Sequence, residues 1–216
     1  MDHIWDIFAG ILFLNTLAAL SISGVLVARG LRKPGSFTVA WMFIALAVWA
    51  FAYAMITISA SLEAKHFWLK IENIGIVSTP VFWFLFTSRY TRQDKWITRP
   101  VQFLLFIIPL ITLIFLFSGH WFELHYASTR PYSASGGPLI IERGPWYWAQ
   151  LSQSYLMLAA GMILMLWHLF IYRSIYRKRI LTVLAGLAVP VALNLFYQVG
   201  ANLMPSVYIP VDLTPI

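Results

Sequence analysis

The stretch from Thr38 to Ala60, TVAWMFIALAVWAFAYAMITISA, contains no charged residue. A helix needs about 20 mostly apolar residues to cross the roughly 30 Å hydrocarbon core of a bilayer. The stretch is long enough for such a helix, and it lacks the alternation of polar and apolar residues that a membrane strand shows. Backbone groups must also find partners inside lipid, so a transmembrane helix is the structure that this stretch predicts.

Five other runs have the same character, and the composition of the whole chain agrees with them. The 216 residues are 60% hydrophobic and 11% charged, with a mean hydropathy of +0.76. A soluble domain carries roughly 25% charged residues, so this chain cannot cover a water-facing surface of its size. We therefore predict one domain, residues 1–216, with the fold of an all-α membrane protein, a polytopic helical bundle. Its six spans are predicted at 4–28, 38–60, 67–88, 101–118, 147–172 and 180–203.

The basic residues gather in alternate connections between these runs. Most of the 15 Lys and Arg residues lie in the loops after the first, third and fifth runs. The positive-inside rule places those loops in the cytoplasm, which leaves the N-terminus outside the inner (cell) membrane. The net charge of +7 then matches anionic lipid headgroups, and we expect membrane lipids and no nucleic acid as partners. Asp2 and Asp6 lie at the start of the chain, and no Lys or Arg precedes the first run, which argues against a cleaved signal peptide.

With an external N-terminus, six spans would leave the C-terminus outside as well. The chain stops at Asp212–Leu213–Thr214–Pro215–Ile216, and Asp or Thr followed by Pro is common where a helix begins. We therefore expect six spans to be present and a seventh to be truncated.

The longest connection, residues 119–146, is predicted to lie outside. Ser133–Pro138, with the sequence SASGGP, is a turn signal, and Leu139–Ile141 after it is apolar enough for a short strand in a hairpin on the bundle. Such a loop either closes over a cavity as a lid or only connects two spans, and the sequence leaves both open. Near the middles of three runs, Pro80, Pro109 and Pro190 each remove a backbone hydrogen bond and are expected to kink a helix.

Polar side chains inside the runs gather toward the predicted external ends. Because such groups are costly in lipid, we interpret them as candidates for a ligand cavity that opens outward between helices. The competing interpretation is that they hydrogen-bond across helices and hold the bundle together. Glu72 is the strongest candidate, since an acid inside a span is a functional residue by default, with Lys65 or Lys70 as a nearby counter-charge. The candidate ligand-binding residues are Glu72, Asn73, Trp148, Gln150, Gln153, Tyr155 and Asn194.

The sequence offers little for catalysis or for a bound cofactor. It has no cysteine, and its histidines form no HExxH motif. GxSxG and P-loop motifs are also missing from the sequence. His168 has no partner at a matching depth for haem, and Lys70 lies too near the outer end of its run for a retinal Schiff base. We expect no enzymatic activity, no cofactor and no metal in this chain.

Several short motifs occur in a fixed order. Trp49–Ala50–Phe51–Ala52–Tyr53 is followed by Phe67–Trp68 and by Gly75, Pro80 and Trp83. The later members are Arg89–Tyr90–Thr91, Pro109, Gly144–Pro145–Trp146–Tyr147–Trp148, Ser154–Tyr155, Pro190 with Asn194, and Asp212–Leu213–Thr214–Pro215. In this order they make the chain similar to the N-terminal seven-span sensor region of bacterial and archaeal histidine kinases, which also precedes some diguanylate cyclases.

The resemblance covers nearly the whole chain and implies a sensory input module in a two-component-type receptor. It implies a homodimer in which an external or membrane-borne signal, such as a small ligand, shifts the helix packing and drives a cytoplasmic kinase or cyclase domain. A ligand can do so only if it binds the two packings with different affinity. An external N-terminus agrees with a cytoplasmic output domain, because seven spans then place the C-terminus in the cytoplasm. The chain departs from the family at Glu72 and Gln153, where a neutral amide and an aromatic residue are expected.

Two other functions remain open from the sequence. A small transporter or channel is the main alternative, and it predicts internal symmetry between the two halves of the chain. Such symmetry is not visible between the first three runs and the last three. A membrane-embedded enzyme is opposed by the lack of catalytic residues described above.

Overall fold

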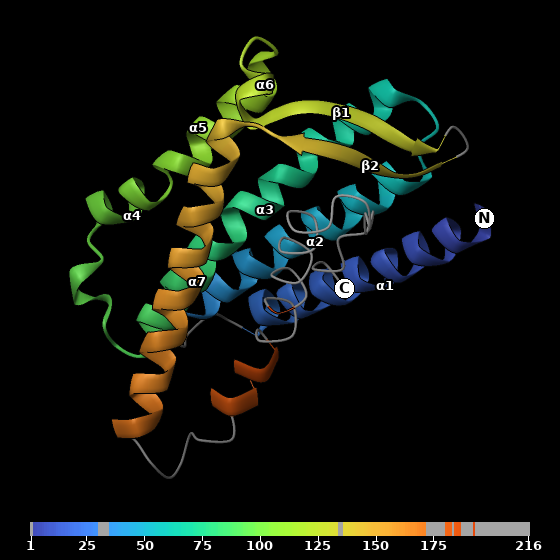
Figure 1. Cartoon of the computed structure of the whole chain (residues 1–216). Coiled ribbons are helices and arrows are strands. Elements are labelled where there is room, and N and C mark those ends of the chain that lie inside the picture. Colours follow the sequence, from blue (N-terminus) through green and yellow to red (C-terminus); the bar gives the residue numbers. More distant parts are fainter. Residues whose placement is uncertain are drawn as a thin grey trace.

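Four long helices dominate the structure, a computed structural model that describes residues 2–29, 35–133, 136–171, 180–182, 184–186 and 192. They are α1 (Asp2–Ala28), α2 (Ser36–Ile58), α3 (Leu62–Tyr90) and α7 (Pro145–Ile171), and each is long and apolar enough to cross a membrane. Helix α1 packs on α2, α2 on α3, and α3 on α7 (Figure 1). These helices lie where four of the six spans are predicted.

The fourth predicted span, 101–118, is a broken helix. Helix α4 (Arg99–Leu105) and helix α5 (Ile107–Ser118) meet at Phe106 with a bend of about 40°. Pro109 explains the break, since a proline inside a helix removes one hydrogen bond and its ring clashes with the carbonyl four residues earlier. By contrast, α3 continues through Pro80 as one helix. The sixth predicted span, 180–203, lies almost entirely outside the described residues, as do Pro190 and the C-terminal tail.

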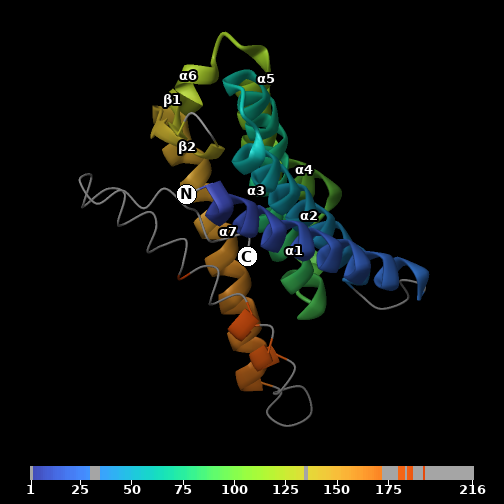
Figure 2. The same cartoon turned by 90° about the vertical axis from the view of Figure 1, so that its right-hand side faces the viewer.

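The connection between α5 and α7 contains the short helix α6 (Phe122–His125) and an antiparallel hairpin of β1 (Tyr126–Ser133) and β2 (Gly136–Arg143). The expected strand at Leu139–Ile141 is confirmed as part of β2. Ile141 pairs with Thr129 across the ladder. The hairpin lies across one end of the bundle, from the start of α7 to the start of α1 (Figures 1 and 2). We call this end of the bundle the hairpin end.

The opposite end, which we call the basic end, carries Arg89, Arg92, Lys95 and Arg99 in and around the α3–α4 connection and the 3₁₀ turn Asp94–Trp96. The start of α1 lies at the hairpin end, because the Trp5 ring meets that of Tyr132 edge-on with centroids 5.7 Å apart. The N-terminal end of α1 and the hairpin therefore lie on the same side of the bundle, as the predicted topology requires.

Two glycines allow the helix backbones to approach closely. A Cβ atom on Gly75 of α3 would lie 2.7 Å from the backbone nitrogen of Trp49 and 2.8 Å from its Cβ in α2. A Cβ on Gly161 of α7 would lie 2.9 Å from the Thr87 hydroxyl of α3 and would also overlap the Trp83 ring. The α2–α3 and α3–α7 crossings thus both depend on a residue without a side chain. With its four long apolar helices and small hairpin, the chain is an all-α polytopic membrane protein.

Candidate functional site

Three polar contacts connect the hairpin to α3, and they follow one another along the helix. The first is at the hairpin tip, where the Lys65 ammonium donates to the carbonyl of Gly137 and to that of Ile56 at the end of α2, 2.8 Å away. Lys65 is only 1% exposed. Gly137 has φ 96°, a left-handed conformation that favours glycine. One buried cation thus joins α2, α3 and the hairpin tip.

The second and third contacts lie farther toward the root of the hairpin. His66 Nε2 is 2.6 Å from the Thr129 hydroxyl of β1. Asn73, which is buried, donates to the Leu69 carbonyl at 2.8 Å, and both of its amide atoms lie within 3.2 Å of the Tyr126 hydroxyl. An amide in lipid needs partners, and here one of them comes from the first residue of β1. The hairpin is therefore a packed cap along α3.

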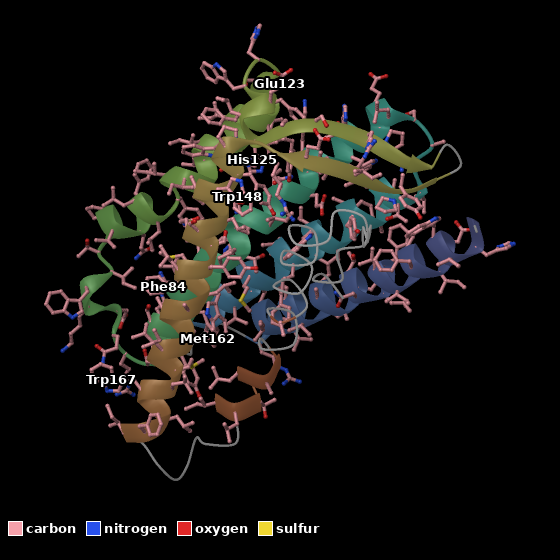
Figure 3. All side chains as sticks on the ribbon, viewed as in Figure 1. Phe84, Glu123, His125, Trp148, Met162 and Trp167 are labelled. Carbon is pink, nitrogen blue, oxygen red and sulfur yellow. The ribbon has the colours of Figure 1, made fainter. Side chains whose placement is uncertain are left out.

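His125 lies at the root of this cap, where α6 meets β1 above the start of α7 (Figure 3). Its ring is 4.4 Å from that of Tyr126 and 5.6 Å from that of Tyr147, measured between centroids. It is 1% exposed, and its Nδ1 has no hydrogen-bond partner within the described part of the chain. Burial lowers the pKa of His125 to about 4, so the ring is neutral at physiological pH.

The junction from the hairpin into α7 is equally tight. The Gly144 amide donates to the His125 carbonyl at 2.9 Å, and a Cβ on Gly144 would lie 2.6 Å from the Glu123 carbonyl oxygen. On the outer side, the Arg143 guanidinium stands 5.3 Å from the Tyr147 ring centroid and 5.7 Å from that of Trp148, a range in which cations and aromatic faces attract. The first turn of α7 is thus fixed to the hairpin.

The predicted ligand residues of α7 lie on two different faces. Gln150 and Gln153 are buried; Gln150 donates to the Ser154 hydroxyl at 2.8 Å, and Gln153 donates to the Leu105 carbonyl of α4 at 3.1 Å. Trp148 is 45% exposed on the other face, and Tyr155 on that face is half-buried. The structure therefore does not bring all four residues of α7 together.

The remaining predicted residues are on α3 and in the sixth run. Glu72 is buried, 6% exposed, and it directly precedes Asn73 beneath the root of the hairpin. The Lys70 ammonium lies 5.9 Å from the Phe117 ring of α5. Asn194 lies outside the described residues. The hairpin end also carries a shallow depression of about 520 Å³, lined by Leu62, Glu63, His66, Phe67 and Lys70.

Within the described ranges, no three His, Asp or Glu side chains stand together as metal ligands do. The chemistry of the site is hydrogen bonding and cation–carbonyl contact, which suits recognition and conformational coupling.

A family model for the N-terminal 7TM region of histidine kinase matches residues 11–216. The chain belongs to this family. Neither the curated proteins nor the solved structures contain a significant match. The resemblance drawn from the ordered motifs is thus confirmed, and the chain is a membrane-embedded, multi-pass sensory input module of a kinase-type receptor. Membership of the family implies a link to a cytoplasmic kinase output domain.

For a histidine-kinase 7TM sensor region, the structure adds residues that sequence reasoning missed. Tyr126 and His125 lie in a loop, and nothing in the sequence pairs that loop with Asn73. The sequence indicates Lys65 only as a counter-charge for Glu72, whereas in the structure its ammonium donates to two backbone carbonyls. The position of Lys65 directly between two apolar runs is the sequence feature that could indicate its role, because a cation at a membrane interface needs partners.

Proposed function

We propose that this sensor region reads a signal from outside the cell or from the membrane at its hairpin end. It passes the signal by helix rearrangement to the cytoplasmic output domain of a homodimeric receptor. The observation that carries the proposal is the row of contacts between the hairpin and α3, from Lys65 through His66 to Asn73. A ligand that moves the hairpin must break or shift these contacts, so the position of α3 depends on the state of the hairpin.

Side chains of α3 form hydrogen bonds with other helices at several depths in the bundle. The Trp83 indole donates to the Leu158 carbonyl of α7 at 3.2 Å. At the basic end, Arg89 donates to the hydroxyl of Thr38 in α2 and to the side-chain oxygen of Gln102 in α4, 3.4 Å away. A shift of α3 therefore changes contacts with α2, α4 and α7, and the shift supplies the two helix packings that the mechanism needs.

The proposal places the hairpin outside the inner membrane and the basic end in the cytoplasm, following the positive-inside rule. The chain has no cysteine, so single cysteines can be introduced at His3, Tyr132 and Lys95 without background. A membrane-impermeant maleimide should label the first two in intact cells and the third only after permeabilisation. The reverse pattern would refute this orientation and the signalling direction with it.

The buried acid beneath the hairpin is the proposed centre of the ligand site, with Asn73 beside it. Glu72→Gln removes the charge while it keeps the shape of the side chain. We expect it to change the autophosphorylation rate of the intact receptor in native-membrane vesicles more than it changes the midpoint of thermal unfolding. Glu63→Gln, on the exposed first turn of the same helix, is the matched control. An unchanged rate at normal expression would exclude Glu72 from the site.

A transporter or channel would behave differently in the same preparation. Sustained, saturable flux of ions or amino acids into proteoliposomes that contain this chain would contradict the sensor proposal. The sensor proposal predicts no flux above that of empty liposomes.

A further inference from the structure

At the bend between α4 and α5, a residue of another helix supplies a hydrogen bond that the broken helix lacks. Pro109 has no N–H, and the helical partner of that missing group is the carbonyl of Leu105, four residues earlier. The Gln153 amide of α7 donates to this same carbonyl, with 3.1 Å between Nε2 and the oxygen. The helix pair meets there at about 40°. A side chain of α7 thus replaces the hydrogen bond that the proline removes from span four.

This replacement has a physical reason in a membrane. An unpaired carbonyl inside lipid is costly, so the broken helix is stable only with an outside donor. Gln153 is 8% exposed, and only its NH₂ group can face a carbonyl oxygen, which fixes the orientation of the amide. Its Oε1 points away and has no hydrogen-bond partner within the described part of the chain. The side chain therefore makes its donor contact with α4 at the break.

Helix α7 also contacts the other arm of the bend. The Trp146 indole donates to the Thr112 hydroxyl of α5 at 2.9 Å, and the Trp146 and Phe115 rings have centroids 5.1 Å apart. One attachment therefore lies on α5, toward the hairpin end, and the other lies on α4 at the break. Because both attachments come from the same straight helix, α7 cannot slide or rotate without a change in the angle between α4 and α5.

We propose that Leu105, Pro109 and Gln153 form a clamped hinge through which α7 sets the angle between α4 and α5 and so moves the basic end of span four. The hinge deepens the proposed signalling function and rests on it for its direction, from the hairpin end to the basic end. The hinge itself, however, depends only on these three residues, so it can be tested in the absence of any signal.

Gln150 provides a matched control on the same helix. It is also a buried glutamine, but within the described part of the chain its amide donates to Ser154 of the same helix and not to another helix. Gln153→Met and Gln150→Met keep the side-chain volume and remove one amide each. The hinge predicts that only Gln153→Met releases α4.

The first measurement is a distance between spin labels in lipid nanodiscs, placed on cysteines at the exposed positions Phe103 of α4 and Ile163 of α7. Gln153→Met should broaden or shift the distance distribution, and Gln150→Met should leave it unchanged. Pro109→Ala restores the N–H and should straighten the span. For a seven-residue helix about 10 Å long, loss of a 40° bend moves its far end by about 7 Å.

The second measurement is a double-mutant cycle on reversible unfolding. Gln153→Met should lower the folding equilibrium constant by roughly 3- to 20-fold in the wild-type background, the range of hydrogen bonds between membrane helices. In the Pro109→Ala background, Gln153→Met should lower the folding equilibrium constant less than twofold, since the Leu105 carbonyl then has a donor in its own helix. Equal losses in both backgrounds, or equal distance distributions for the two Gln variants, would overturn the hinge.

Autophosphorylation of the intact receptor separates the hinge from the signalling proposal. If Gln153→Met changes both the label distance and the kinase output, the hinge carries signal. If the distance changes and the output does not, the hinge stands as structure and its role in signalling is refuted. In either case the cysteine-labelling result for orientation is independent of the hinge.

Discussion

The backbones of α2 and α3 approach closely at Gly75, and this crossing can be tested with a single methyl group. Gly75→Ala places a Cβ where 2.7 Å separates it from the Trp49 nitrogen and 2.8 Å from the Trp49 Cβ. Both of these atoms belong to the backbone frame of α2, so no flexible side chain can move away. The helices must separate to make room.

The size of the effect follows from this geometry. Ordinary van der Waals contact begins at 3.4 Å, and the carbonyl oxygen of Ala45 in α2 is nearer still than the Trp49 atoms, so the helices must move apart by at least about 0.7 Å. A gap of that size forfeits a quarter to a half of the dispersion attraction between the facing atoms. Overpacked sites lose about 1–3 kcal/mol, and the higher helix propensity of alanine returns up to about 1 kcal/mol. We expect a net loss of about 1–2 kcal/mol for Gly75→Ala.

The assay is reversible unfolding of the purified chain in mixed micelles, followed by circular dichroism, with Gly10→Ala as the control. A Cβ on Gly10 in α1 meets no atom within 4 Å, so this variant should be as stable as the wild type or up to about 1 kcal/mol more stable. If both variants unfold at the same denaturant concentration, the close approach of α2 and α3 is wrong.

Three further perturbations test the cap and its anchors. Tyr126→Phe removes the hydroxyl next to Asn73 and should lower stability by about 1 kcal/mol in thermal melts, whereas Tyr132→Phe, exposed near the hairpin tip, should change nothing. Lys65→Met leaves two carbonyls without their shared donor and should increase proteolytic cleavage of the hairpin several-fold in limited digestion. Burial holds the pKa of His125 near 4, below its value of about 6.5 in an unfolded chain, so stability should fall as pH drops from 6.5 toward 4, by about 3 kcal/mol at most. Denaturant titrations at several pH values would show that slope in the wild type and its loss in His125→Gln.

The helices could be predicted from sequence because lipid makes hydropathy decisive. A stretch such as Thr38–Ala60 has few alternatives in a bilayer, and the structure places α2 at Ser36–Ile58. The hairpin was predictable for a local reason, since Gly136 and Gly137 supply a turn and Leu139–Ile141 supplies an apolar strand. In both cases the signal lies within a short segment of the chain.

The contacts of the polar residues could not be predicted in this way. Helical periodicity separates Trp148 and Tyr155 from Gln150 and Gln153, but it does not say which face turns inward. The partner of Gln153 is the carbonyl of Leu105, 48 positions earlier, and it is available only because Pro109 follows it. Whether a buried amide serves a ligand or another helix depends on such tertiary neighbours, which no local pattern encodes.

The distribution of these contacts along α3 indicates where the helix moves. Hydrogen bonds between membrane helices contribute about 0.6 kcal/mol each on average, so the polar contacts of His66 and Arg89, near the two ends of α3, can exchange at small cost. Separation at the close-packed Gly75 crossing costs several times more. A moving α3 should therefore pivot about Gly75, while its ends change partners.

This pivot can be tested with label pairs across α2 and α3 in the intact receptor. Labels at the exposed positions Trp41 of α2 and Ile74 of α3 report on the distance between the two helices near the Gly75 crossing. Labels at Ile58 and Phe67 report on the distance at the hairpin end. When Tyr126→Phe loosens the cap, the hairpin-end distance should change by more than the distance between Trp41 and Ile74. Equal changes at both pairs would mean that α3 translates as a whole, and the Gly75 crossing would then not be the fixed point of the movement.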